Sequence, residues 1–376
     1  MMDRDKEGPP MPARRTPRTL LAIPVSLTLF LLVPADLPDL APTSSPTGPS
    51  VRSRSPGAAA TDAALARLVT RGGAPAAALL AREESGTRFA TTGGAMARSD
   101  HFRAGSVTKT FIATVVLQLA AEHRLSLSDT VDDHLPGLVR GAGNDGRELT
   151  LRALLTHTSG LHDFTADTGG TVPVTPLQAV HIALTHPPAD RGRFAYSNTN
   201  YVLLGLVVEQ VTGHSYAAEA ERRIITPLGL SGTSFPGSRR SLPAPHGRAY
   251  AADGSDVTTL DPRVAGAAGE LVSTLADLNR FYTALLGGDL LPPRLLREMR
   301  DTRTAHGSYG MGLFPVKLSC GVTVWGHNGR ISGSYVRTAA TGDGRHVLTF
   351  RVNTDGLTDP DLEPALLAAE FCPRTS

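Results

Sequence analysis

The chain has 376 residues, of which 41% are hydrophobic and 19% charged, so it can bury a large core in one domain or in two fused subdomains. Its formal net charge is +2 and its basic residues are spread along the sequence, which excludes the concentrated basic face of a nucleic-acid binding protein. Lysine is scarce and occurs only as Lys6, Lys109 and Lys317.

Residues 1–35 have the pattern of a signal peptide or an N-terminal membrane anchor. Three arginines, at positions 14, 15 and 18, precede an apolar stretch over residues 20–33. This stretch is short for a membrane span, which needs about 20 residues, and it suits the apolar region of a signal peptide. Residues 36–60 are rich in Pro, Ser and Thr and predict a flexible linker. We therefore expect export from a bacterial cell, with membrane contact only through the N-terminal segment.

A single folded domain is expected over residues 61–373, with strands towards both ends and helices between them. The patterns predict helices over 61–71, 107–122, 151–155, 177–184, 201–211, 274–286 and 362–371, and strands over 76–83, 87–93, 318–325 and 347–352. The most economical arrangement is an α+β fold in which both ends of the chain build one antiparallel sheet. Helices at the two ends flank this sheet, and an all-helical subdomain is inserted at about 125–262.

The first chemical pattern is the spacing of Ser106 and Lys109 at the start of an apolar helix. Residues three apart share a helix face, so the lysine amine can take the proton of the serine hydroxyl. Backbone N–H groups at the helix start can stabilise the oxyanion that forms when the serine attacks a carbonyl. A serine cap followed by a solvated lysine is the alternative, but this lysine lies in an apolar helix of a chain almost without lysine.

The second pattern is Tyr196 with Asn198, directly before a helix. A phenol placed between cations has a lowered pKa, so Tyr196 is a candidate proton shuttle. Asn198 is a candidate partner for both Lys109 and a substrate carbonyl. The alternative is an asparagine-rich turn that caps the following helix.

The third pattern ends the alternating strand and contains His327, Asn328, Gly329 and Arg330. A glycine at a strand edge lets a substrate backbone approach closely. His327 is a candidate to donate a proton or to orient Tyr196, and its charge is expected to depend on pH near neutrality. The alternative is a histidine and a glycine turn that end a strand.

Cys320 and Cys372 are the only cysteines in the sequence. In an exported protein such a pair favours one disulfide, and two buried free thiols are the alternative. Two cysteines are too few for a structural zinc site. A metal pair of His157 and His162 lacks acidic residues at a supporting ligand spacing.

In their order and separation, the three chemical patterns resemble the motifs of the serine penicillin-recognising enzymes, which are Ser-x-x-Lys, Tyr-x-Asn and Lys-Thr-Gly or His-x-Gly. Four longer stretches are similar to the same family: FRAGSVTKTF, LLTHTSGLHDF, YSNTNYVLLG and YGMGLFPVKLSCG. The resemblance is greatest to secreted D-alanyl-D-alanine carboxypeptidases and to class C β-lactamase-like esterases, and it covers about residues 60–372. It implies a serine hydrolase with the β-lactamase/DD-peptidase fold, and it supports a disulfide between Cys320 and Cys372.

Carried over residue by residue, the resemblance implies that Ser106 is the acylated nucleophile and that Lys109 and Tyr196 share proton transfer. Asn198 would position the substrate amide, and His327 would complete the hydrogen-bond network on the strand side. This chemistry requires no cofactor and no metal ion.

The strand motif departs from the family pattern at Asn328 and Arg330, where hydroxyl side chains commonly bind the terminal carboxylate of the substrate. Backbone N–H groups of Ser106 and Arg330 would still form the oxyanion hole. Asn328, Gly329 and Arg330 are the expected substrate-binding residues, and the Arg330 guanidinium either pairs with a substrate carboxylate or lies in solvent.

The expected substrate is a D-Ala-D-Ala peptidoglycan stem peptide. A small ester, a D-amino-acid peptide and a β-lactam are the alternatives within the same chemistry, and β-lactams are expected inhibitors. A catalytically silent ligand-binding protein on the same fold is the rival class of function. We expect the protein to be a monomer.

Overall fold

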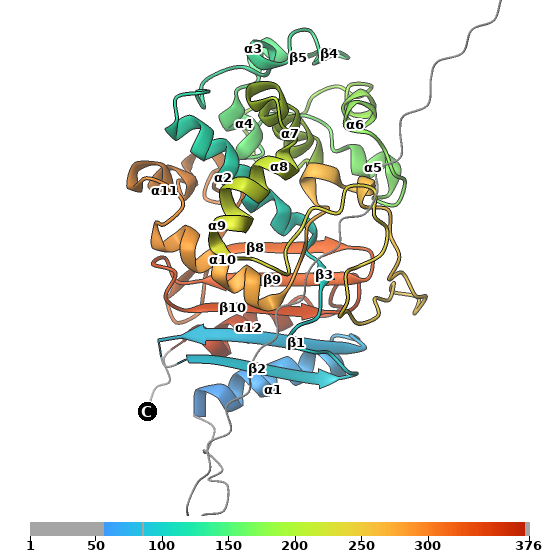
Figure 1. Ribbon diagram of the computed structural model, residues 1–376, viewed down its shortest axis with the longest axis vertical. Coiled ribbons are helices and arrows are strands. Elements are labelled where there is room, and N and C mark those ends of the chain that lie inside the picture. Colours follow the sequence, from blue (N-terminus) through green and yellow to red (C-terminus); the bar gives the residue numbers. More distant parts are fainter. Residues whose placement is uncertain (1–55, 85, 373–376) are drawn as a thin grey trace, which may run out of the picture. The chain divides into compact units, whose positions relative to one another are not determined.

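A six-stranded antiparallel sheet lies at the centre of the described chain, and both ends of the chain build it (Figure 1). The computed structural model describes residues 56–84 and 86–372. The strand order is β2-β1-β10-β9-β8-β7, so the early strand β1 pairs with the late strand β10 and places Ala77 opposite Val352. The strands are β1 (Ala76–Glu83), β2 (Gly86–Gly93), β7 (Phe314–Lys317), β8 (Thr323–Ile331), β9 (Ser334–Ala340) and β10 (Val347–Val352). The predicted α+β fold is confirmed.

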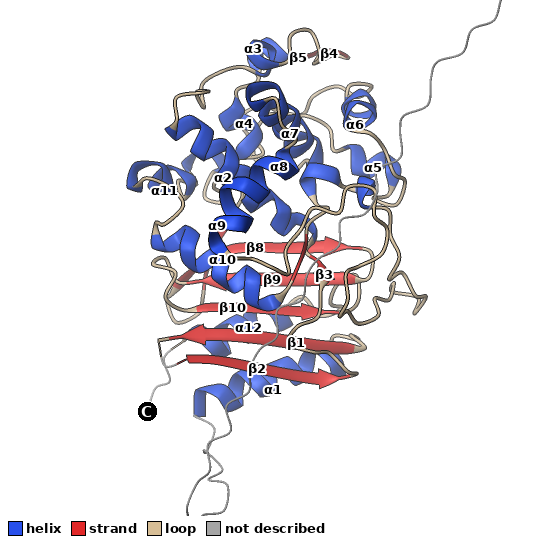
Figure 2. Cartoon of the chain, in the orientation of Figure 1, coloured by secondary structure: helices blue, strands red, loops and turns tan. Residues whose placement is uncertain are grey.

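Helices cover both faces of this sheet (Figure 2). On one face, α1 (Pro56–Thr70) and α12 (Leu362–Phe371) pack against each other and share an apolar core with the strands. On the other face, α10 (Leu275–Gly287) lies on β1, β9 and β10. The helix α2 (Thr108–Ala121) joins this second core, where the rings of Phe111 and Phe281 stack at 3.8 Å between centroids. The second core therefore anchors the helix that carries Lys109.

Seven helices, most of them short, follow α2 in the chain and form the region that lies beyond β8 in Figure 1. They are α3 (Val131–His134), α4 (Leu151–Leu155), α5 (Phe164–Thr168), α6 (Pro176–Ala183), α7 (Asn198–Thr212), α8 (Tyr216–Ala220) and α9 (Thr226–Leu228). α11 (Pro293–Met299) comes after α10, and two-residue strands form the pairs β3 (Phe102–Arg103) with β6 (Val272–Ser273) and β4 (Arg140–Gly141) with β5 (Asn144–Asp145).

Two predicted boundaries are wrong within the described residues. The helical region was expected to reach about residue 262, yet residues 229–261 contain no α-helix, because prolines and glycines recur along this stretch. The linker was expected to reach residue 60, yet residues 56–60 already form the first turn of α1. The remaining linker residues and the N-terminal segment 1–35 lie outside the described residues.

The predicted strand 318–325 is also wrong in its position. Leu318 to Val322 form a tight turn between β7 and β8, in which Gly321 has a φ of +86° that favours glycine. Cys320 lies in this turn and forms a disulfide with Cys372, directly after α12. The predicted pairing is therefore present in the structure, and it ties the β7–β8 turn to the last helix.

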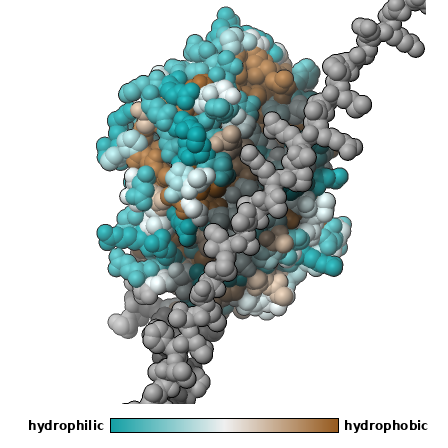
Figure 3. Space-filling model, in the orientation of Figure 1, coloured by the Kyte–Doolittle hydropathy of each residue, from teal (hydrophilic) through white to brown (hydrophobic). Residues whose placement is uncertain are grey.

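The surface in Figure 3 is mainly hydrophilic, with hydrophobic patches of which one lies near α6. In α6, Leu177 is 58% exposed. Along the described chain, every helix is too short or too polar to cross a membrane.

Candidate active site

Ser106 lies in a single 3₁₀ turn, Gly105–Val107, that leads directly into α2. Gly105 has a φ of +50°, and a Cβ atom at this position would lie 2.8 Å from the backbone nitrogen of Arg330. A glycine is therefore required at Gly105 by both its conformation and its close approach to β8. This approach brings the nucleophile candidate against the strand that carries the third motif.

Lys109 lies one turn further along and is fully buried. Its Nζ donates hydrogen bonds to Ser106 Oγ at 3.0 Å, to Asn198 Oδ1 at 2.7 Å and to the Ala268 carbonyl oxygen at 2.7 Å. Burial lowers the pKa of Lys109 to about 7, against the opposing effect of the Asp163 charge. A substantial fraction of the amine is therefore neutral at pH 7 and can accept the Ser106 proton.

Tyr196 approaches the same serine from the other side, and its hydroxyl donates a hydrogen bond to Ser106 Oγ at 2.7 Å. Its ring lies 4.8 Å from Lys109 Nζ. The prediction of a lowered pKa is wrong, because burial raises the pKa of Tyr196. The hydrogen bond to Ser106 lowers this pKa by a smaller amount, and the negative charge of Asp163 raises it further. The residue is 38% exposed, so solvent moderates this shift, yet its direction leaves Tyr196 a neutral phenol.

Asn198 begins α7 and is held from three directions. Its Oδ1 accepts from Lys109, and its Nδ2 donates to Asp163 Oδ2 at 2.9 Å and to Thr165 Oγ1 at 3.0 Å. The predicted contact between Asn198 and Lys109 is present. Asp163, the N-cap of α5, was missed by the sequence patterns because its distance of 35 residues from Asn198 leaves no local signal.

His157 is a second residue whose position the sequence did not reveal. It is fully buried, and its ring lies 4.3 Å from the Tyr196 ring. Its Nδ1 accepts hydrogen bonds from the Ser197 backbone N–H at 3.2 Å and from Asn200 Nδ2 at 3.1 Å. His157 therefore holds the turn that presents Tyr196 and Asn198, and it does not pair with His162.

His327 lies behind the site and is 1% exposed. Its Nδ1 donates to the Asn328 carbonyl oxygen at 2.5 Å, so its Nε2 accepts from the hydroxyl of Tyr309 at 2.7 Å. Burial and then the charge of Lys109 lower the pKa of His327 to about 3. The expectation of a charge change near neutral pH is therefore wrong, because this imidazole stays neutral across the physiological range.

The remaining residues of the strand motif are Asn328, Gly329 and Arg330, and Asn328 and Arg330 line the cavity beside Ser106. A Cβ atom at Gly329 would overlap the Ala104 carbonyl oxygen, so the glycine permits the contact between β8 and the chain before Ser106. Asn328 Nδ2 lies 3.4 Å from the hydroxyl of Tyr335, which directs the amide along the sheet. Gly329 thus shapes the site through the backbone.

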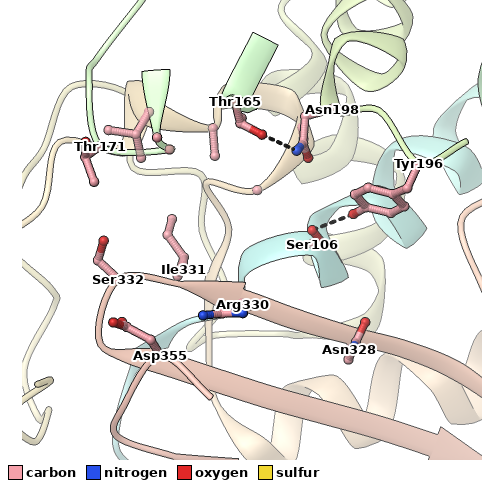
Figure 4. A pocket seen from close by; sticks show the side chains of 16 residues that line it. Ser106, Thr165, Thr171, Tyr196, Asn198, Asn328, Arg330, Ile331, Ser332 and Asp355 are labelled. Atoms are coloured by element: carbon pink, nitrogen blue, oxygen red, sulfur yellow. Dashed lines mark hydrogen bonds between the residues drawn. The ribbon is translucent and has the colours of Figure 1, made fainter. Parts of the chain in front are cut away.

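A cavity of about 540 Å³ opens at Ser106 (Figure 4). Figure 4 shows Ser106 and Tyr196 at one end and Asp355 at the other. The Arg330 side chain is exposed in this cavity and forms no ion pair with any residue in 56–84 or 86–372, whereas Asp355 accepts hydrogen bonds from the backbone N–H groups of Gly333 and Ala252. The lining residues are Ser106, Thr165, Gly169, Gly170, Thr171, Tyr196, Asn198, Val264, Ala265, Ala268, Gly269, Asn328, Arg330, Ile331, Ser332 and Asp355.

Comparison with known proteins agrees with this geometry. The Beta-lactamase family model matches residues 61–371. The chain belongs to the Beta-lactamase family. Its fold is that of the serine β-lactamases and penicillin-binding proteins, as the order of the Ser106, Tyr196 and His327 motifs implies.

Three similar proteins illustrate the range of the family. Penicillin-binding protein 4 of Amycolatopsis lactamdurans is 33% identical over 217 residues, which cover 55% of this chain and 56% of that protein. A D-stereospecific amidohydrolase from Streptomyces sp. is 43% identical with a TM-score of 0.79, covering 84% of this chain and 99% of that chain. The D-amino acid amidase from Ochrobactrum anthropi SV3 is 26% identical with a TM-score of 0.72, covering 83% and 97%. This chain spans about half the length of the first curated relatives that it matches.

Proposed function

We propose that this protein is an exported serine amidohydrolase that cleaves amide or peptide bonds of D-configured acyl donors. The observation that carries the proposal is the buried Lys109 amine, 3.0 Å from Ser106 Oγ and with a pKa lowered to about 7. A neutral amine in this place is a general base for a serine nucleophile. The catalytically silent alternative is disfavoured because the Lys109 amine and the Tyr196 hydroxyl both form hydrogen bonds with Ser106 Oγ.

In the proposed reaction, Lys109 Nζ takes the Ser106 proton while Oγ attacks the substrate carbonyl. The backbone N–H groups of Ser106 and Arg330 face the developing oxyanion. The amide bond then breaks, and the leaving amine takes the proton that Lys109 received from Ser106, relayed through the Tyr196 hydroxyl that bonds Ser106 Oγ. Water then enters the cavity and attacks the ester while Lys109 takes one of its protons. Lys109 passes that proton to Ser106 Oγ as the acid leaves, which restores the serine hydroxyl and the neutral amine.

The D-configuration of the acyl donor rests on similarity. The relative that is 43% identical is named for D-stereospecific amide hydrolysis, and the one that is 26% identical is named a D-amino acid amidase. Both solved structures are covered almost entirely by this chain. An amide or peptide whose acyl group is a D-amino acid residue is therefore the favoured substrate class.

A D-Ala-D-Ala carboxypeptidase is the second candidate, and Arg330 favours it. The guanidinium lines the cavity without a carboxylate partner among the described residues, so it offers a charge-assisted pair to the terminal carboxylate of a peptide. The Tyr196 and Lys109 chemistry would be identical in both reactions.

A substrate panel separates these candidates. Initial rates are measured on D-alanine amide, L-alanine amide, a diacyl-lysyl-D-Ala-D-Ala peptide and a chromogenic cephalosporin. The proposal predicts fast release from D-alanine amide and little from its L-enantiomer. Equal rates on both enantiomers would contradict D-specificity, and exclusive cleavage of the D-Ala-D-Ala peptide would select the second candidate.

Labelling with a fluorescent penicillin tests the nucleophile itself. The wild type is expected to form a covalent adduct, and Ser106→Ala is expected to lose it while keeping its circular dichroism spectrum. An adduct that persists in Ser106→Ala would remove Ser106 from the mechanism, whatever the substrate is.

Export is proposed on two grounds. The sequence of residues 1–35 has the pattern of a signal peptide or anchor, and the disulfide between Cys320 and Cys372 suits an oxidising compartment. Detection of the processed protein outside the cytoplasm tests this proposal, and a monomeric state stays a prediction for size-exclusion chromatography with light scattering.

A further inference from the structure

Two histidines and one aspartate converge beside the active site, outside the catalytic machinery. His162 precedes α5, Asp167 lies within α5, and His186 lies after α6. The Nε2 atom of His162 is 2.7 Å from Asp167 Oδ2, and the Nε2 atom of His186 is 2.9 Å from Asp167 Oδ1. The two imidazole rings stack, with centroids 3.8 Å apart and an angle of 22° between their planes. Both rings thus present the same nitrogen to one carboxylate.

These three side chains have the geometry of a metal-binding set. Their ligand atoms all lie within 4.8 Å of one another. Zinc binds histidine nitrogen and carboxylate oxygen at about 2.0–2.2 Å, so an ion between these atoms needs only small side-chain movements. Two histidines and one carboxylate leave an open coordination position for water. The side chains are 27%, 35% and 38% exposed for His162, Asp167 and His186, so an ion can enter from solvent.

We propose that His162, Asp167 and His186 form a binding site for a divalent transition-metal ion of the zinc class. To bind the metal, each imidazole would carry its proton on Nδ1 and offer the Nε2 lone pair to the ion in place of the hydrogen bond to Asp167. No oxidation or reduction takes place.

The site connects to the catalytic residues through the backbone of His162. Its carbonyl oxygen accepts hydrogen bonds from Ser197 Oγ at 3.1 Å and Thr199 Oγ1 at 2.7 Å, and these two residues flank Asn198. Asp167 lies between Thr165 and Gly169, which both line the cavity. A bound ion would therefore brace the wall of the cavity and the turn that presents Asn198, without touching the substrate.

A second set of potential ligands, Glu83, His346 and Glu370, is a poorer candidate and serves as a control. Glu370 already forms an ion pair with Arg88 at 2.9 Å and a hydrogen bond with His346 at 3.0 Å. A cation bound there would compete with the arginine. The cluster around Asp167 has no arginine or lysine within ion-pair distance among the described residues, and so it favours a metal ion more strongly.

Metal binding is tested on the whole purified protein by titration with Zn²⁺ in a calorimeter, with metal analysis after dialysis. The wild type is expected to bind one zinc per chain. Asp167→Asn and His186→Ala are expected to lose this binding, and His346→Ala and His134→Ala to keep it. His134 is the matched control because its Nε2 contacts a single carboxylate, Asp129, at 3.0 Å. Absence of saturable binding, or equal binding by Asp167→Asn, would overturn the proposal, as would loss in His346→Ala.

Thermal unfolding supplies a readout that does not depend on catalysis. At about 100 times the dissociation constant, Zn²⁺ is expected to raise the Tm of the wild type by about 5 °C and that of His186→Ala by nothing. Circular dichroism of the metal-free variant shows whether it folds. A wild-type Tm that does not change at saturating zinc would contradict the bracing role.

Discussion

The start of α2 and the end of β8 contribute to the same site, but the sequence predicts them unequally. Ser106 and Lys109 are three residues apart on one turn, so local spacing alone brings the hydroxyl and the amine within 3.0 Å. His327 meets its partner Tyr309 across 18 residues, and its burial determines its charge. Spacing predicts a contact within a helix, whereas the protonation state of a strand residue depends on what the fold packs around it.

Replacement of the buried Lys109 tests the contribution of α2 to the site and has the largest expected effect on kcat/KM. Lys109→Met keeps the length of the side chain but removes the base, so kcat/KM is expected to fall about 10³-fold. Lys317→Met, at an exposed position in β7, is the matched control and is expected to leave the rate unchanged. Retention of activity by Lys109→Met, with a native circular dichroism spectrum, would refute the assignment.

The contact between β8 and the chain that precedes α2 is tested at Gly329. A methyl group there would overlap the Ala104 carbonyl oxygen, so Gly329→Ala is expected to destabilise the protein by about 1–3 kcal/mol and to lower kcat/KM at least tenfold. At Gly94 the nearest atom to an added Cβ is 3.6 Å away, so Gly94→Ala is the control. Equal Tm values for the two variants would show that the close approach is not required.

The fold was predicted more completely than the site. Strands 76–83 and 347–352 and helix 362–371 have the predicted bounds. The two strands are short apolar runs buried largely on both faces, and the helix buries one apolar stripe. Strand β9 was missed, since its buried run from Val336 to Ala340 includes Arg337 and Thr338 and so shows neither alternation nor a continuous apolar run.

Within the candidate site, the contacts among Ser106, Lys109 and Asn198 were predicted, and their supporting residues were not. His157 and Asp163 reach Tyr196 and Asn198 only through tertiary packing, 35 or more residues away in the chain. The pKa shifts of Tyr196 and His327 were wrong for the same reason, because burial dominates both and a sequence does not show which groups are buried.

Replacement of Arg330, at the exposed end of β8, is expected to have a smaller effect on catalysis, and only for substrates that carry a carboxylate. If Arg330 binds a carboxylate, Arg330→Ala is expected to raise KM about tenfold for a D-Ala-D-Ala peptide and to leave D-alanine amide unaffected, since a charge-assisted hydrogen bond contributes about 1.5–3 kcal/mol. The exposed Arg345 provides the control substitution, Arg345→Ala. Equal losses on both substrates would place Arg330 outside carboxylate recognition.

The smallest expected effect is a shift in pH dependence. The Asp163 charge raises the pKa of Lys109 against the larger effect of burial, so Asp163→Asn is expected to lower that pKa by less than about one unit. Asparagine still caps α5, and the exposed Asp190→Asn serves as the control. The acid limb of kcat/KM should move to lower pH only in Asp163→Asn, and an upward shift would contradict the sign of this interaction.

The pH dependence of kcat/KM in the wild type tests the central claim most directly, because it reports the ionisation of the free enzyme. A protonated Lys109 cannot accept the Ser106 proton, so the rate should rise tenfold per pH unit on the acid side and level off above a midpoint of about 7. His327, with a pKa lowered to about 3, should add no further limb between pH 5 and pH 9 by this account. A rate that keeps rising towards about pH 10, as an ordinary lysine would give, or one that is flat from pH 5, would contradict Lys109 as the base.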